Sequence, residues 1–374
     1  MAAFRNMRRF AASAFLPAAF AVLLASCGDS ASSSGDSAPG ASVIPVDYTL
    51  GREMNARLGQ GINFAGFVNP RGGTAAVRDR DFAIVKAAGF NSVRIPVAWG
   101  SNSDVATHTV DSDLLADVIR DIQLAVANGL AVVVAFRAGD GLAKAAGGAK
   151  AGFDSTVFET EKAHFLGLWG QIAAAMAEFP DNMVALELLD GADIPDTARA
   201  NSLLADAYAV VRAVAPGKTI VFQTPRNGSF ADLGEMNLPH DGNIVVGGRY
   251  YEPADFTRQG AGFDCRGDAA LISTAAADLQ AYAALAVKHY PDVNGIDHVP
   301  LNLGSFGVAG STGPCGVDGP SDRGRAYWTS TTAHAAVDNG FSFHYWAFSD
   351  ADGFDAYDVA VDQWLPGFPD ALLR

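Results

Sequence analysis

The sequence has few charged residues, and beyond its N-terminus it lacks any long apolar run. Charged residues make up 18% of the 374 residues and hydrophobic residues 49%, which excludes a chain that is disordered throughout. No apolar run of about 18 residues follows the N-terminal segment, so the sequence does not predict a polytopic membrane protein. Basic residues are also scarce, and the net charge is −15. Such an acidic chain is a poor partner for nucleic acid, which needs a basic face.

Motifs for common cofactors and metals are missing as well. The chain has no phosphate-binding loop and no Cys-x-x-Cys pair, and its 7 His are not spaced as metal ligands. We therefore predict no cofactor and no metal. Asp350, Asp352 and Asp355 form an acidic loop that leaves Ca²⁺ as an alternative, because Ca²⁺ prefers oxygen ligands. We interpret this loop as solvated.

The N-terminus has the pattern of an export signal. In residues 1–26, three Arg and no acidic residue precede or flank an apolar stretch at 10–24, which is short for a membrane span. The stretch runs into Leu-Ala-Ser-Cys, which resembles the bacterial lipoprotein box, in which the Cys is lipidated. Gly28 follows Cys27, a pattern that resembles outer-membrane sorting in Gram-negative bacteria. The resemblance predicts a cell-envelope protein anchored to the membrane through Cys27; an ordinary secretory signal is the alternative.

The rest of the chain divides into a linker and one domain. Residues 27–46 are rich in Ser, Gly and Ala and are typical of a flexible tether. Residues 47–374 alternate short β-branched runs with helical periods, which indicates parallel strands joined by helices. The predicted strands are 61–65, 92–96, 131–136, 184–189, 219–222, 244–250, 300–305 and 342–347. About eight such units predict a single (β/α)₈ TIM barrel, with a doubly wound open sheet as the alternative.

Several segments at the predicted strand ends resemble motifs of glycoside hydrolase family five, the cellulase family. In chain order they are Gly61–Asn63, Ala88–Trp99, Glu187–Ala192, Tyr250–Gly260, Gly304–Gly307 and Tyr345–Phe348. Within the fourth segment, the sequence from Phe256 to Gly260 resembles the family's Phe-Thr-His-Gln-Gly. Each motif is weak alone, but the order and the barrel-sized intervals make the resemblance specific. It implies a (β/α)₈ barrel that acts on, or binds, carbohydrate at the C-terminal ends of its strands.

The resemblance also shows where this chain departs from the family. A retaining glycosidase needs two carboxyl groups about 5–5.5 Å apart, and the family's two glutamates correspond to Gly191 and Ser305. Glycine has no proton to donate, and a serine without a base is a poor nucleophile. We therefore expect the retaining reaction to be lost. Asp190, one residue from the acid position, is the nearest alternative carboxylate.

The remaining pocket positions predict a ligand-binding cleft. The family's His residues at the third and sixth strand ends correspond to Arg137 and Arg249, while Arg94, Tyr251 and Trp346 are retained. We expect the three guanidinium groups to line one cavity and to favour an anionic glycan, with Trp346 stacking on a sugar ring. The predicted ligand-binding residues are Arg94, Arg137, Asp190, Arg249, Tyr251 and Trp346.

Three alternatives to this interpretation stay open from the sequence. The arginines could pair with Asp190, Glu252 or other loop acids and merely fill the cleft. The chain could be an active glycosidase with relocated carboxylates, for which Asp190, Asp140, Glu252 and Asp350 are candidates. It could also be an envelope protein that binds a partner and has kept only the barrel.

The two cysteines that lipidation does not use lie in Gly-rich loops. Cys265 and Cys315 follow the predicted sixth and seventh strands, which are neighbours in an eight-stranded barrel. In an exported, oxidising setting we predict a disulfide between them. Two unpaired thiols are the alternative.

Overall fold

The structure is a computed structural model that describes residues 43–68, 77–137, 140–148, 152–311, 313–349 and 352–373. Within these residues, eight parallel strands close into a barrel in the order β1-β10-β9-β8-β7-β6-β5-β2. The strands are β1 (Gln60–Asn63), β2 (Ser92–Val97), β5 (Ala131–Arg137), β6 (Val184–Asp190), β7 (Ile220–Gln223), β8 (Ile244–Tyr250), β9 (Leu301–Phe306) and β10 (Ser342–Tyr345). The predicted TIM barrel is confirmed, and closure of β1 on β10 excludes the open sheet.

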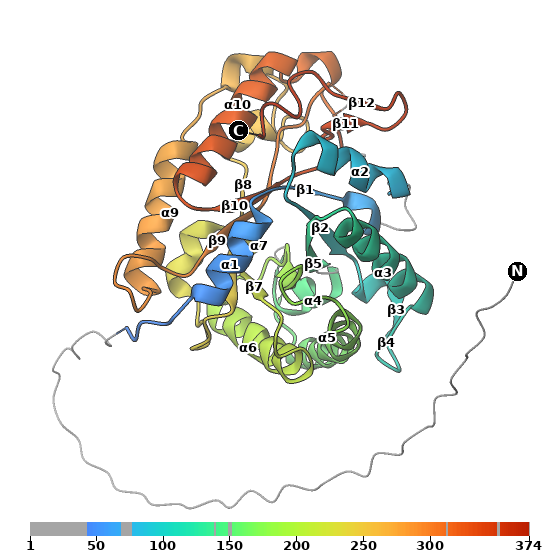
Figure 1. Cartoon of the computed structure of the whole chain (residues 1–374), viewed down its shortest axis with the longest axis vertical. Helices are drawn as coiled ribbons and strands as arrows, with labels where there is room; N and C mark the ends of the chain where they lie inside the picture. Colours follow the sequence, from blue (N-terminus) through green and yellow to red (C-terminus); the bar gives the residue numbers. More distant parts are fainter. Residues whose placement is uncertain are drawn as a thin grey trace, which may run out of the picture. The chain divides into compact units, whose positions relative to one another are not determined.

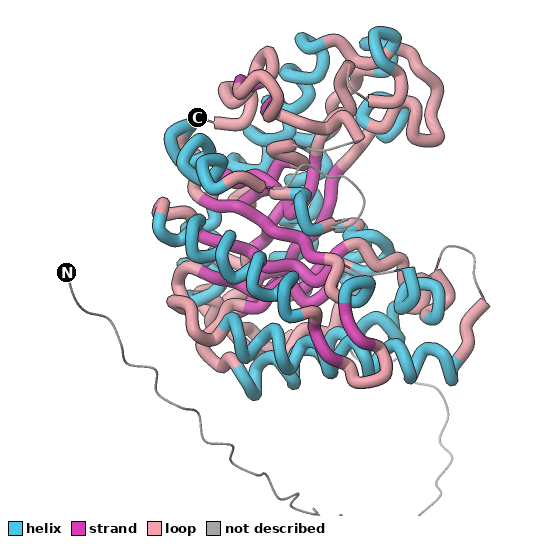
Figure 2. Tube along the Cα trace, turned by 90° about the vertical axis from the view of Figure 1, so that its right-hand side faces the viewer, coloured by secondary structure: helices cyan, strands magenta, loops and turns pink. Residues whose placement is uncertain are grey.

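The helices are α1 (Thr49–Leu58), α2 (Asp79–Ala88), α3 (Ser112–Ala127), α4 (Asp140–Ala145), α5 (Ser155–Met176), α6 (Thr197–Val214), α7 (Pro225–Gly228), α8 (Ala254–Thr257), α9 (Ala275–His289) and α10 (Asp322–Asp338). The longer helices from α2 to α10 surround the strands on the outside of the barrel (Figures 1 and 2), whereas α1 contacts β2, β5, β8 and β10 and lies across one end of it. Short 3-10 turns are η1 (Ala65–Phe67), η2 (Gly100–Asn102), η3 (Phe230–Glu235), η4 (Gly267–Ala270) and η5 (Gly316–Asp318). Two small antiparallel pairs join β3 (Ser103–Asp104) to β4 (Thr109–Val110) and β11 (Tyr357–Asp358) to β12 (Gln363–Trp364).

The strand β5 illustrates why these residues form the barrel. Its run from Ala131 to Phe136 is apolar without alternation, and each of these side chains is buried. A strand buried on both faces needs this composition. The helix before this strand, α3, is bounded at both ends by its sequence. At its N-terminus the Asp111 side chain accepts hydrogen bonds from two backbone N–H groups. After its C-terminus Gly129, with φ +72°, turns the chain toward β5.

The unit after β7 departs from the regular pattern. Instead of a long α-helix, the chain forms the short α7 and the 3-10 turn η3 before β8. Arg226 and Asn227 within α7 have positive φ angles of 52° and 63°, which side-chain-bearing residues rarely adopt. The irregular loop contributes to the cleft described below.

The chain enters the barrel through α1. Val46 forms a parallel bridge with Asp292, and residues from Val43 onward belong to one compact unit. The predicted signal peptide, Cys27 and most of the predicted tether lie outside the described residues. By length and composition alone, Gly267–His289 could cross a membrane, but its second half is α9, which packs against α10 and η3.

Candidate ligand-binding cleft

A cleft of about 610 Å³ opens among the loops that follow the barrel strands. Its lining comes from the ends of β5, β8 and β9 and from the loops after β7 to β10. The residues that matter for its chemistry are Arg137, Arg226, Asn227, Arg249, Tyr251, Glu252, Arg258, Ser305, Trp346, Asp352 and Phe354. A hollow of similar size, about 600 Å³, lies between α1 and α10, but none of the predicted site residues lines it.

Arg94 lies beneath the cleft and not on its surface. Its side chain is fully buried, and Nε and Nη2 donate to the two carboxylate oxygens of Glu187 at 2.7 and 2.8 Å. Nη1 donates to Asn63 Oδ1 at 2.9 Å, and Nη2 lies 2.8 Å from Asp190 Oδ1. The expectation that three guanidinium groups line one cavity is therefore corrected. Arg94 stays in the barrel interior because these acceptors are buried with it.

Asp190 is the centre of this charged network. Arg249 Nη2 lies 2.5 Å from its Oδ1 and Arg137 Nη1 lies 3.3 Å from its Oδ2, while Gln223 Nε2 donates to Oδ1 at 3.2 Å. Burial disfavours ionisation of Asp190, but the positive charges of Arg249, Arg94 and Arg137 outweigh it and hold the pKa of the carboxyl well below its usual range. Asp190 is fully buried, so it acts beneath the cleft and not as a surface ligand group.

The network carries more positive than negative charge. Three guanidinium groups, those of Arg94, Arg137 and Arg249, share two carboxylates, those of Glu187 and Asp190. Arg137 and Arg249 also reach the cleft, with 33% and 20% of their side chains exposed. The sequence left two interpretations of these arginines open: that they bind a ligand in the cleft, or that they pair with acidic side chains. In the structure Arg137 and Arg249 both pair with Asp190 and face the cleft.

At Gly191, which the sequence resemblance assigns to the family's acid/base glutamate, the space for a side chain is filled from another strand. Gly191 has φ +73°, and a Cβ added there would lie 2.5 Å from Arg249 Nη2. The Arg249 guanidinium, held by Asp190, therefore occupies the space that a side chain at residue 191 would need. The Gly191 N–H donates to Gln223 Oε1 at 2.7 Å, which fixes the turn.

Ser305, which the sequence resemblance assigns to the family's nucleophile, hydrogen-bonds to a tyrosine. The Tyr251 hydroxyl lies 2.5 Å from Ser305 Oγ, and burial raises the pKa of the Tyr251 phenol. Among the described residues, no histidine or carboxylate hydrogen-bonds to Ser305. Within the described part of the chain, its hydroxyl thus has no hydrogen-bonded base of the kind that activates a serine nucleophile.

Aromatic side chains form one wall of the cleft. Trp346 is half-buried and lines it together with Phe354, whose ring meets the Tyr251 ring edge-on with centroids 6.1 Å apart. Such faces can stack on a sugar ring. Trp99, in contrast, is fully buried and belongs to the barrel wall.

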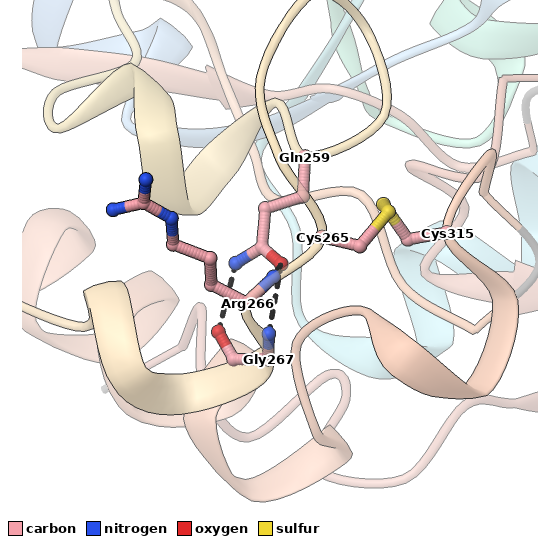
Figure 3. Close-up of a disulfide and its surroundings, with 5 residues drawn as sticks. All are labelled: Gln259, Cys265, Arg266, Gly267 and Cys315. Atoms are coloured by element: carbon pink, nitrogen blue, oxygen red, sulfur yellow. Dashed lines mark hydrogen bonds between the residues drawn. A yellow bond between two sulfur atoms is a disulfide. The ribbon is translucent and has the colours of Figure 1, made fainter.

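The predicted disulfide is confirmed, and it fastens two cleft loops together. Cys265, in the loop after β8, is bonded to Cys315, in the loop after β9, with Cα atoms 5.6 Å apart. Figure 3 shows the buried side chain of Gln259 beside it, bonded to the backbone of Arg266 and Gly267.

The acidic loop and the relocated-carboxylate candidates are placed only in part. Asp350 lies outside the described residues, as does the side chain of Asp140. Asp352 is exposed at the cleft, and Glu252 is exposed beside it. In the described part of the chain, no group of three or more His, Cys, Asp or Glu side chains could hold a metal ion.

Sequence reasoning missed two further arginines at the cleft. Arg226 lines it from the irregular loop after β7, and Arg258 from the loop after β8. A signal for Arg258 was present, because it stands at the His of the Phe-Thr-His-Gln-Gly motif. No sequence signal placed Arg226 there, because its position depends on the unusual backbone of α7.

Comparisons with known proteins agree with this architecture. The family model for cellulase (glycosyl hydrolase family 5) matches residues 56–352. Cellodextrinase A from Ruminococcus flavefaciens is 26% identical over 187 residues, 50% of this chain and 54% of that protein. Endoglucanase H from Acetivibrio thermocellus is 22% identical over 302 residues, 79% of this chain and 30% of that protein. The chain thus spans about half or less of these curated relatives.

Solved structures show the same barrel. Endoglucanase Cel5A from Thermotoga maritima superposes with a TM-score of 0.71 at 25% identity, over 88% of this chain and 100% of that chain. The same enzyme in complex with mannotriose gives a TM-score of 0.72 at 26% identity, over 86% and 99% of the two chains.

Proposed function

The chain belongs to glycosyl hydrolase family 5, the cellulase family, and from that premise we propose that it binds a carbohydrate in the cleft without hydrolysing it. Solved relatives carry mannotriose and cellobiose as substrates, which supports a carbohydrate ligand. Trp346 and Phe354 at the cleft supply the aromatic faces that such a ligand stacks on.

One observation carries the loss of catalysis: the Arg249 guanidinium fills the place of the acid/base side chain at Gly191. Retaining hydrolysis needs a proton donor for the leaving group and a carboxylate nucleophile, and a positioned general acid alone is worth about 10²–10⁴ in rate. An arginine stays protonated in a protein and cannot be that acid. Ser305, bonded to Tyr251, does not replace the nucleophile.

The alternative, an active glycosidase with relocated carboxylates, finds little support in the buried acids. Asp190 is ionised and surrounded by donors, so it has no proton to give. Both oxygens of Glu187 are bonded to Arg94. Of the described acidic residues, Glu252 and Asp352 line the cleft, and they are the pair that an assay must test.

We propose further that the cleft prefers an anionic glycan. Arg137 and Arg249 line the cleft above a network with more positive than negative charge. A guanidinium group matches a carboxylate or phosphate with two parallel hydrogen bonds. A local potential of this sign can exist on an acidic protein, because the field in a cleft depends on nearby charges.

Our proposal for the location is the cell envelope, with a lipid on Cys27. The Leu-Ala-Ser-Cys sequence at 24–27 carries this part, and the Cys265–Cys315 disulfide fits an oxidising compartment. Replacing Cys27 by Ser should release the protein from the membrane fraction or block its maturation. A Cys27→Ser protein that stays membrane-bound and processed would contradict the anchor.

The proposed function is tested by measuring binding and hydrolysis together. The purified chain should bind cello- or manno-oligosaccharides, seen as a change in tryptophan fluorescence, and release no reducing ends above buffer. Turnover that disappears in Glu252→Gln or Asp352→Asn would overturn the proposal and identify relocated carboxylates. A chain that binds neither neutral nor acidic oligosaccharides would also overturn the proposal.

A further inference from the structure

Four arginines among the described residues line the cleft, and they differ in how far acidic side chains already neutralise them. Arg137 and Arg249 both pair with Asp190. Arg226 pairs with two acidic side chains of η3. Arg258 is exposed, and no acidic side chain in the described part of the chain forms an ion pair with it. Arg258 therefore offers the guanidinium group with the fewest protein partners.

The backbone that carries Arg258 is fixed by hydrogen bonds. Its N–H donates to Ala254 O at 3.0 Å, and its carbonyl accepts from Ala261 N at 3.0 Å. The preceding residue, Thr257, is fully buried, and its carbonyl accepts from Ala309 N at 3.0 Å, across to the loop after β9. The backbone at Arg258 is thus held within its own loop and, through Thr257, to the loop after β9.

The residue that follows Arg258 fixes the other side of the loop (Figure 3). Gln259 is fully buried. Its Nε2 donates to Gly267 O at 2.8 Å, and its Oε1 accepts from the N–H groups of Arg266 and Gly267 at 2.7 and 2.9 Å. The disulfide between Cys265 and Cys315 joins this loop to the next one. Binding through Arg258 would then order only one side chain, which limits the entropy lost.

We propose that Arg258 is the specificity-determining residue of the cleft and that it binds an oxyanion carried by the sugar ring, with a uronic acid carboxylate as the probe. This inference rests on the proposed function. Arg137 and Arg249 contribute positive potential, but Asp190 already takes hydrogen bonds from them. Arg258 adds a planar fork that forms no ion pair with a described carboxylate, although Glu252 and Asp352 also line the cleft. A lysine there would keep the charge but lose the two parallel hydrogen bonds.

The test compares two hexamers that differ only at C6: cellohexaose and a β-1,4-linked hexamer of glucuronic acid. Calorimetry measures both with the wild type and with Arg258→Gln, Arg258→Lys and Arg266→Gln. Arg266 is the matched control, because it lies on the same loop, pairs with Asp264 at 3.2 Å and does not line the cleft. Melting temperatures verify that each variant is folded.

We expect the wild type to prefer the glucuronate hexamer and Arg258→Gln to lose that preference. A hydrogen-bonded charged pair contributes about 1.5–3 kcal/mol, so the affinity for this hexamer should fall about 10- to 100-fold. Cellohexaose binding should change by less than about twofold, Arg258→Lys should be intermediate, and Arg266→Gln should match the wild type. Competition by free glucuronate but not by inorganic phosphate would identify the oxyanion as a carboxylate; the reverse would identify a phosphate.

The outcomes separate this inference from the proposed function. If Arg258→Gln weakens the glucuronate hexamer no more than Arg266→Gln, the assignment of Arg258 is wrong while anionic binding stands. If the wild type binds both hexamers equally, the preference for an anionic glycan and the role of Arg258 are both refuted, but carbohydrate binding is not. If neither hexamer binds, or either is hydrolysed, the proposed function itself is overturned.

Discussion

Replacing Asp190 by Asn tests whether this one carboxylate stabilises the charged network beneath the cleft. The substitution keeps the shape of the side chain and removes its charge. Arg94, Arg137 and Arg249 all contact this carboxylate, so Glu187 alone would remain to balance three buried or half-buried guanidinium groups. An unpaired charge away from water is costly, and we therefore expect the folded state to be destabilised.

The size of the effect follows from burial. Asp190 is fully buried, and removing one partner of a buried ion pair costs about 3–5 kcal/mol. An unfolding entropy of about 2.1 cal/mol/K per residue gives about 0.7 kcal/mol/K for a domain of roughly 330 residues. The melting temperature should therefore fall by about 4–7 °C. The lower end applies if the Asn oxygen keeps accepting from one arginine.

The dependence on pH follows from the low pKa of Asp190 in the fold. A carboxylate whose pKa is depressed on folding stabilises the protein above its unfolded pKa, about 3.9, and that stabilisation is lost as the pH falls through the folded value. The difference between wild type and Asp190→Asn should therefore be constant from neutral pH down to about pH 4 and shrink below it.

Differential scanning calorimetry measures the effect, with and without sulfate. Sulfate should stabilise Asp190→Asn more than the wild type, because Arg137 and Arg249 then lack their counter-charge. The control is Asp264→Asn, which removes a carboxylate that is 80% exposed and pairs with Arg266; its melting temperature should stay within about 1 °C of the wild type. A loss no larger than this control, or equal sulfate effects, would refute the central role of Asp190.

Two further predictions concern Gly191 and the buried His344. Gly191→Ala places a Cβ at a residue with φ +73° and only 2.5 Å from Arg249 Nη2. It should therefore lower the urea midpoint of unfolding more than the control Gly295→Ala, where φ is +71° and no atom lies within 4 Å of the added Cβ. Equal decreases in the two variants would mean that backbone strain alone matters. Burial and the charge of Arg94 hold the pKa of His344 well below its usual value. As the pH is lowered, this imidazole is therefore protonated in the unfolded state before it is protonated in the folded state. The free energy of unfolding should fall as the pH drops below about 6.5. In urea titrations at pH 7.5 and 5, His344→Gln should reduce this fall, and an unchanged fall would assign it to other groups.

Sequence patterns were sufficient for the barrel because its strands are specified by burial. A continuous apolar run such as 131–136 has no stable place except between two covered faces. The order of the motifs placed Gly191 and Ser305 at the ends of β6 and β9, where the structure has them.

The site could be predicted only as a set of positions. Whether an arginine faces the cleft depends on which carboxylates lie within reach of its guanidinium group. Those distances depend on the folded structure and cannot be taken from the sequence. Arg94 is fully buried against Glu187, whereas Arg249 is 20% exposed. Arg258 was not predicted as a site residue, because its motif position indicated only a loop and did not show that its side chain would form no ion pair with a described acidic residue.

Asp190, Gly191 and Arg249, the positions at which the sequence resemblance predicts departures from the family, are coupled in the structure. A glutamate at 191 and the present Arg249 guanidinium would compete for the same space, and the negative charge of Asp190 holds that guanidinium in place. Restoring Glu at 191 alone would therefore meet an arginine that it must displace. Ser305 is separate, because its hydroxyl is bonded to Tyr251 and not to this network. Recovery of hydrolysis should thus require Arg249→His together with Gly191→Glu and Ser305→Glu, and Gly191→Glu with Ser305→Glu should stay inactive without it.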